Sequence, residues 1–195
     1  MRQPECAAGV LQLLEMMGLG DWRVMVVAGE SGAGKTSLAI SIAEVVQATL
    51  LSQDGYFRLA PPENHAARLL DLTRVGPDEV DLERFASDVE RLRAGECVTP
   101  PLLETAVEPA GERIIVEGTY LMGFAPADVR VFIDRTFAET EADRRKRGRD
   151  KMEPFVERVL ALEQPFVREH LPLANVIVNK AFVPRAHRGA RAPRH

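Results

Sequence analysis

The sequence predicts a single α/β domain built on a doubly wound parallel β-sheet, and three observations lead to this expectation. Short apolar runs typical of buried strands alternate with longer segments whose apolar residues recur at helical spacing. A glycine-rich turn joins the first of these strands to the helix after it. The 195 residues, 46% of them hydrophobic, suffice for one core and are too few for two ordinary domains.

The first half of the chain supplies two helices and two strands to this prediction. Residues 7–17 have apolar side chains at helical spacing, and Gly18 follows as a stop, so we expect a helix packed on the sheet. The continuous apolar run 24–28 reads as a buried strand. Residues 37–47 are apolar around most of a helix circumference and should be largely buried. Residues 49–52 are a short strand candidate followed by polar and aromatic residues.

The second half begins with a segment that has no clear sheet pattern. Residues 59–76 contain two consecutive prolines and a helical fragment at 66–70, which favours a loop-rich substrate segment. Residues 82–92 form an amphipathic helix pattern ended by Gly95. The remaining expected elements are strands at 113–117, 129–134 and 176–178, a charged helix at 137–147, and a helix at 154–171 that contains Pro165.

A complete phosphate-binding loop follows the first expected strand. The residues that match G-x-x-x-x-G-K-[ST] are Gly29, Glu30, Ser31, Gly32, Ala33, Gly34, Lys35 and Thr36, with Ser37 next. Glycines let successive backbone N–H groups turn toward phosphate oxygens, and the helix after them adds its positive end. Lys35 would reach the β- and γ-phosphates, and the Thr36 hydroxyl would bind Mg²⁺. An incidental lysine in a glycine-rich turn is the alternative, but the strand and helix on either side favour a nucleoside triphosphate site.

Two carboxylates stand where expected strands end. Asp54 follows the second strand and could accept a proton from a substrate hydroxyl, although Asp-Gly is also a common turn pair. Glu117 ends the third strand before Gly118 and could hold Mg²⁺ directly or through water. Asp134, after the next strand, is a rival acid in surroundings that look structural. With a phosphate loop one strand away, we favour Asp54 as the catalytic base and Glu117 as a metal ligand.

Positive charge is concentrated in residues 143–151, DRRKRGRDK, around a glycine joint. Guanidinium groups bind phosphoryl oxygens through a bidentate fork and stay charged, as expected of a lid over a transferring phosphate. A solvated helix face and a nucleic-acid patch are the alternatives. The position between the fourth expected strand and the last helix favours a lid at about 137–152.

Composition narrows the partners and the compartment. A net charge of −4 and a pI near 5.7 argue against a surface for nucleic acid. Cys6 and Cys97 are far apart and outside any metal-binding pattern, which favours a reduced, cytoplasmic chain. With no basic and apolar leader and no apolar run near ~18 residues, we expect neither export nor membrane insertion. The Arg-, Ala- and His-rich segment 184–195 is expected to be a disordered tail.

Together these segments resemble the uridine kinase and phosphoribulokinase group of P-loop kinases. The stretches that carry the resemblance are GESGAGKTS, SQDGYFR, VGPDEVDLERFASDVERLRAGE, IIVEG, RGRD and FVERVLALEQPFVREHLPLANVIV, within 24–178. The resemblance implies a P-loop NTPase three-layer sandwich of five parallel strands in order 2-3-1-4-5. It also implies roles for Asp54 as the base, Lys35 and Thr36 on phosphates and Mg²⁺, Glu117 near the metal, Tyr56 and Arg58 beside the acceptor, and Arg147 and Arg149 in the lid.

Two departures from the family pattern concern the lid and the acceptor. The lid is shorter than in uridine kinases, and residues 102–108 lack the aromatic and histidine that would recognise a pyrimidine. We therefore expect a kinase domain at 1–183 that uses ATP and Mg²⁺ to phosphorylate a hydroxyl of a nucleoside or of a sugar- or vitamin-like alcohol. The sequence leaves a homo-oligomer open.

Two other functions compete with that expectation. One is a non-catalytic nucleotide-binding regulator that keeps the loop without an acceptor site. The other is an NTPase switch, for which Asn179-Lys180-Ala181-Phe182 begins like the guanine-binding N-K-x-D. Phe182 stands where that motif needs a carboxylate, so guanine selectivity is unsupported.

Overall fold

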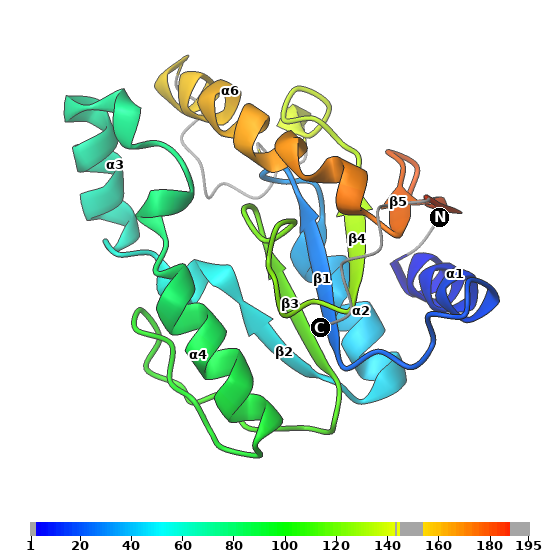
Figure 1. Cartoon of the computed structure of the whole chain (residues 1–195). Helices are drawn as coiled ribbons and strands as arrows, with labels where there is room; N and C mark the ends of the chain where they lie inside the picture. The colour runs from blue at the N-terminus through cyan, green and yellow to red at the C-terminus, as the bar shows by residue number, and fades with distance from the viewer. Residues whose placement is uncertain (1–2, 143, 145–153, 188–195) are drawn as a thin grey trace.

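The computed structural model describes residues 3–142, 144 and 154–187 of the chain (Figure 1). Within these residues a sheet of six strands has the order β2-β3-β1-β4-β5-β6. The strands are β1 Val24–Gly29, β2 Thr49–Ser52, β3 Ile114–Gly118, β4 Val129–Ile133, β5 Val176–Val178 and β6 Pro184–Ala186. The first five in sequence are mutually parallel, as predicted, and their predicted order is confirmed.

Most helices lie close to their expected positions, but residues 137–140 of the helix expected at 137–147 form a turn, and residues 143 and 145–147 lie outside the described part of the chain. The α-helices are α1 Gln3–Met16, α2 Lys35–Val46, α3 Pro61–Leu70, α4 Leu82–Arg93 and α6 Pro154–Glu169, which contains Pro165. Short 3-10 turns are η1 Gln53–Tyr56, η2 Leu72–Arg74, η3 Pro77–Glu79 and η4 Leu171–Leu173. The segment 59–76 is more helical than its sequence suggested, because Pro61 and Pro62 begin α3 at a position where the ring of proline favours a helix start.

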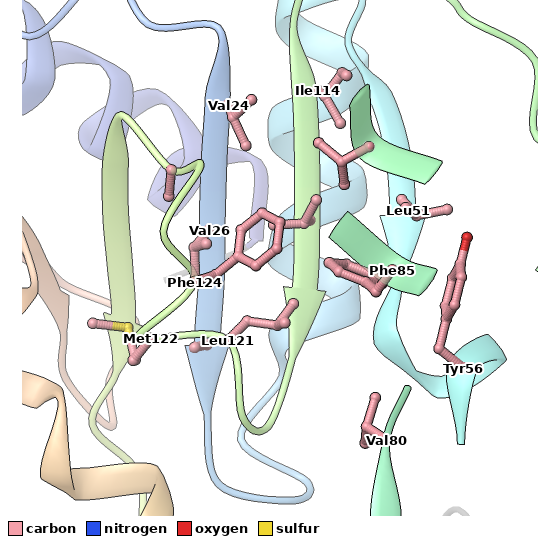
Figure 2. Packing of buried hydrophobic residues seen from close by; sticks show 14 of the residues in the cluster. Val24, Val26, Leu51, Tyr56, Val80, Phe85, Ile114, Leu121, Met122 and Phe124 are labelled. Carbon is pink, nitrogen blue, oxygen red and sulfur yellow. The ribbon is translucent and has the colours of Figure 1, made fainter. Parts of the chain in front are cut away.

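Alternate residues of β1 divide the core into two layers. Met25 and Val27 face the helices α1 and α2, whereas Val24, Val26 and Ala28 face the layer that includes α4. Figure 2 shows this second layer, where Phe85 and Phe124 pack over the sheet with ring centroids 5.4 Å apart. Both faces of the sheet are thus covered, as a parallel sheet requires.

The sixth strand corrects the expected start of the tail. Pro184–Ala186 pairs antiparallel with β5, and the His187 N–H donates to the Asn175 carbonyl at 2.7 Å. The tail was expected from residue 184 because this stretch is poor in apolar residues. Its order comes instead from backbone pairing, which composition does not report. Residues 188–195 lie outside the described part of the chain.

Parallel strands bring the candidate site residues to one edge of the sheet. Ser52 pairs with Glu117 across β2 and β3, and Ala28 pairs with Gly118 across β1 and β3. The loops that leave these strands therefore meet at the same edge, where open α/β sheets bind ligands. Figure 1 shows α6 running across this end of the sheet. None of the described helices combines the length and the apolar character of a membrane span.

Candidate active site

The phosphate loop connects β1 to α2 in the conformation that its glycines allow. Gly32 and Gly34 have φ angles of 77° and 102°, which residues other than glycine rarely adopt. Gly34 caps α2, and the Ala33 N–H donates to the Glu30 carbonyl at 3.1 Å. The loop therefore presents backbone amides at the N-terminus of a helix, which is an anion-binding arrangement.

Lys35 and Thr36 extend from the first turn of α2. The Lys35 ammonium donates to the Glu30 carbonyl at 3.1 Å, so it folds back along the loop. Thr36 and Ser37 are exposed. The Thr36 hydroxyl donates to the Glu117 carboxylate at 3.3 Å, which joins the loop to the end of β3.

Glu117 is a buried carboxylate at the centre of this edge. Only 3% of the residue is exposed, and the Ser52 hydroxyl donates to Oε1 at 2.6 Å. Burial raises the pKa of Glu117, whereas the charge of Lys35 and the hydrogen bonds from Ser52 and Thr36 lower it. Carboxylate and hydroxyl oxygens are the donors that Mg²⁺ prefers, so Glu117 and Thr36 fit this ion chemically.

Asp54 lies beside Glu117 in the turn after β2. Its backbone N–H donates to the Ser52 hydroxyl at 3.3 Å, so the hydroxyl of Ser52 connects the backbone of Asp54 to Glu117. The negative charge of Asp54 also raises the pKa of Glu117, which places the two carboxylates in electrostatic contact. The turn is capped by Ser52 rather than by Asp54. Asp54 is exposed at the edge where an acceptor hydroxyl would have to approach.

The structure gives Tyr56 a different place from the one that the family resemblance implied. Tyr56 is fully buried, packs edge-on against Phe85 and donates its hydroxyl to Asp88 at 2.9 Å (Figure 2). Burial, together with the negative charge of Asp88, raises the pKa of Tyr56. Tyr56 therefore belongs to the core under α4 and not to a surface that a substrate can contact.

Replacing Tyr56 with phenylalanine is expected to lower stability without changing catalysis. The variant loses a hydrogen bond to an ionised group, and Asp88 keeps Arg84 and Arg91 as partners, so the loss should be about 1.5 kcal/mol. Thermal unfolding and steady-state kinetics measure the two effects separately. A raised KM for the acceptor would return Tyr56 to the substrate site.

The Arg58 side chain contacts two neighbouring segments of the chain. Its Nε donates to the Asp78 carbonyl at 3.1 Å, and its Nη1 lies 3.5 Å from Asp81 Oδ2. These contacts join the segment just after η1 to η3 and to the start of α4. The side chain is about half exposed, so a role beside the acceptor remains a prediction.

The side chain of Glu30 bonds to residues after β4 and in α6. It is 3% exposed and accepts from the Phe137 N–H at 2.6 Å, from Gln164 at 3.1 Å and from Arg168 at 2.7 Å. Arg168 also donates to Asp134 at 3.0 Å. The carboxylate of Glu30 thus links the phosphate loop to α6, and Asp134 belongs to this structural network.

The lid arginines Arg147 and Arg149 lie outside the described residues, but Arg144 of the same basic run is described. Arg144 is 2% exposed and donates from Nη2 to the Phe137 carbonyl at 2.9 Å. Its aliphatic stem lies against Gly32, where an added Cβ would come within 2.7 Å of Arg144 Cγ. The basic run predicted arginines over this loop, but its sequence could not single out Arg144.

A buried charged cluster that sequence reasoning missed lies between α3 and α6. Arg68 forms a bidentate pair with Glu79, with both distances 2.7 Å, and a third contact with Glu163 at 3.1 Å. Burial raises the pKa of Glu163, and the positive charges of Arg68 and Lys35 oppose this shift. Burial raises the pKa of Tyr120, the charges of Glu163 and Glu79 raise it further, and the charge of Arg68 lowers it. The Tyr120 backbone N–H donates to Gln53 at 2.9 Å. The Glu79 carbonyl also accepts from the Arg58 N–H at 2.8 Å, so the cluster is connected to the chain just after the turn that carries Asp54.

Known proteins resemble the chain in sequence and in fold. The uridine kinase of Chlamydia pneumoniae is 28% identical over 182 residues, which cover 78% of this chain and 79% of that protein. The uridine kinase of Leuconostoc citreum is 27% identical over 183 residues, covering 80% and 86%. No family model matches the chain.

Two solved structures share the fold at low sequence identity. A D-glycerate 3-kinase from Cryptococcus neoformans var. grubii has a TM-score of 0.57 and 12% identity, covering 94% of this chain and 98% of that one. A possible uridine kinase from Bacillus stearothermophilus has a TM-score of 0.53 and 16% identity, covering 91% and 99%.

Proposed function

We propose that the chain, a distant relative of the uridine kinases at 27–28% identity over most of its length, transfers the γ-phosphoryl group of ATP to a hydroxyl of a small metabolite. The observation that carries the proposal is the contact chain at the edge of the sheet. Thr36 and Ser52 both donate to Glu117, and Asp54 lies beside them. These contacts support a nucleotide, a metal and a catalytic base at one place.

Each proposed role follows from the chemistry of phosphoryl transfer. The amides of the phosphate loop and Lys35 hold the β- and γ-phosphates in line with the acceptor. Asp54 accepts the proton of the acceptor hydroxyl while its oxygen bonds to the γ-phosphorus and the bond from that phosphorus to the β–γ bridging oxygen breaks, so that ADP leaves. Catalysis then rests on positioning and on charge neutralisation.

Thr36 and Glu117 are the residues that would hold Mg²⁺, either directly or through water. When bound, the ion neutralises charge on the β- and γ-phosphate oxygens. We assign Arg147 and Arg149 the same electrostatic task, on the basis of the family resemblance. Omission of Mg²⁺ should abolish turnover, and its return should restore turnover.

The charged cluster of Arg68, Glu79 and Glu163, which is connected to the segment just after Asp54 through the bond from the Arg58 N–H to the Glu79 carbonyl, favours an uncharged acceptor. Arg68 is already bound to two carboxylates, Glu79 and Glu163, both of which are buried. Among the described residues of this cluster, Arg68 is the cation, and it is already paired with both carboxylates. An acceptor that carries a carboxylate or phosphate would therefore be repelled by Glu79 and Glu163 without gaining a cation of its own. Alcohol hydroxyls can instead donate to such carboxylates. A nucleoside or a neutral sugar- or vitamin-like alcohol therefore fits better than a sugar acid.

A coupled ADP-release screen tests both parts of this proposal. Matched acceptor pairs isolate the charge effect: glycerol against glycerate, pantothenol against pantothenate, and uridine as a neutral nucleoside. We expect ADP release with at least one neutral alcohol and a higher kcat/KM for the neutral member of each pair. Preferred use of the acids would overturn the acceptor assignment. ATP binding without turnover on any alcohol would favour the non-catalytic regulator.

A further inference from the structure

Glu30 is a buried carboxylate in the proposed phosphate-binding loop. Glu30 occupies the first variable position of the loop, and its negative charge would repel phosphate if it were unpaired. The Arg168 guanidinium at 2.7 Å neutralises this charge, and the Gln164 amide at 3.1 Å and the Phe137 N–H at 2.6 Å donate further hydrogen bonds to the carboxylate. The carboxylate is therefore turned to these groups and holds a segment far away in sequence.

The segment that Glu30 holds ends in Arg144. Phe137 donates its backbone N–H to the Glu30 carboxylate, and its carbonyl accepts from Arg144 Nη2 at 2.9 Å and from the Thr140 hydroxyl at 3.0 Å. Thr140 also lies 3.2 Å from the Ser31 carbonyl, and its backbone carbonyl accepts from the Arg144 N–H at 2.9 Å. The position of Arg144 over the loop thus depends on Phe137, and that of Phe137 on Glu30.

The Arg144 guanidinium has two donor atoms, Nε and Nη1, without a hydrogen-bond acceptor among the described residues. Its Nε and Nη1 are buried and make no hydrogen bond within the described part of the chain, although 98% of the residue is covered. Burying guanidinium N–H groups without acceptors is costly. A Cβ added at Gly32 would lie 2.9 Å from the Arg144 Cδ, the carbon that carries Nε, so this part of the side chain lies against the phosphate loop. A phosphate oxygen is the acceptor that this loop would bring.

We propose that Glu30 is a positioning residue which, through Phe137, sets Arg144 in place to bind a β- or γ-phosphate oxygen of the nucleotide. The inference rests on the proposed function for the identity of the ligand, but it concerns nucleotide binding and not the acceptor. It gives the Glu30 side chain a task separate from that of the loop amides. It also makes Arg144 a phosphate ligand whose aliphatic stem already lies against the loop.

Calorimetric binding of the non-hydrolysable analogue AMP-PNP with Mg²⁺ tests the inference in a double-mutant cycle. We expect Arg144→Met and Glu30→Gln each to weaken AMP-PNP binding about tenfold, the effect of losing one charge-assisted hydrogen bond. Because the two act in series, the double variant should be no weaker than Arg144→Met alone. Binding of AMP, which lacks the β- and γ-phosphates, should stay unchanged in all variants.

The matched control is Glu139→Gln, a carboxylate in the same segment whose hydrogen-bond and ion-pair partners among the described residues are Thr136 and Lys180, outside the loop. It should bind AMP-PNP like the parent chain. If Glu30→Gln does not fold, Arg168→Lys replaces it in the cycle, because it disturbs the same carboxylate. Additive losses, or equal losses for AMP, would overturn the inference. Both outcomes can be read without turnover, so a failed acceptor screen leaves the test intact.

Discussion

Replacing Asp54 with asparagine is expected to lower kcat about 10²–10⁴-fold, the usual contribution of a general base. Asparagine keeps the size and the hydrogen-bonding capacity of the side chain but cannot take a proton from the acceptor hydroxyl. The phosphate loop is untouched, so the affinity for ATP should remain within about threefold of the parent value. Single-turnover kinetics together with calorimetric ATP binding separate these two effects.

Asp21→Asn is the matched control for that experiment. Asp21 is exposed, and it precedes β1 at the opposite edge of the sheet, so the same chemical change there should leave kcat unchanged. If Asp54→Asn retained full turnover, Asp54 would have no part in proton transfer, and the acceptor would have to be sought elsewhere along the edge.

Replacing Glu117 with glutamine is expected to have the second largest effect, a loss of about 10²–10³-fold in kcat that added Mg²⁺ only partly restores. An amide is a weaker ligand than a carboxylate, and the metal contributes several kcal/mol to phosphoryl transfer. The Mg²⁺ dependence of ADP release measures the change. Unchanged dependence on Mg²⁺ would contradict a metal role for Glu117.

Stability provides an independent check on Glu117. Its pKa is raised in the folded chain, chiefly by burial, so the ionised form is less favourable there than in the unfolded chain. The carboxyl group therefore weakens folding increasingly as the pH rises above its pKa in the unfolded chain. Without nucleotide and metal, Glu117→Gln should unfold at pH 7 at no lower denaturant concentration than the parent chain. Large destabilisation would indicate a structural role instead.

Local sequence patterns predicted the parts of the site whose contacts are close in sequence. The phosphate loop needs a strand, a glycine-rich turn and a helix in succession, and these are adjacent in the chain. Glu117 was found because it ends an apolar strand, and parallel strands that end together share an edge. The strand order came from the family resemblance, since neighbouring strands such as β1 and β4 are separated by about half of the chain.

The parts that escaped prediction depend on contacts between distant segments. Arg68 and Glu163 are 95 residues apart, and Glu30 and Arg168 are 138 apart, so no local pattern relates them. Tyr56 lies two residues from Asp54, yet the turn η1 leaves Asp54 exposed and buries Tyr56 under α4. Adjacency in sequence therefore did not place both residues in the site.

The fate of the γ-phosphoryl group tests the central claim most directly. ³¹P NMR of the chain incubated with ATP, Mg²⁺ and the acceptor panel distinguishes a new phosphomonoester from inorganic phosphate. We predict a phosphomonoester formed in equal amount to ADP, and its disappearance with Asp54→Asn. ADP accompanied only by inorganic phosphate, or bound ATP that no alcohol consumes, would contradict phosphoryl transfer to a hydroxyl at this sheet edge.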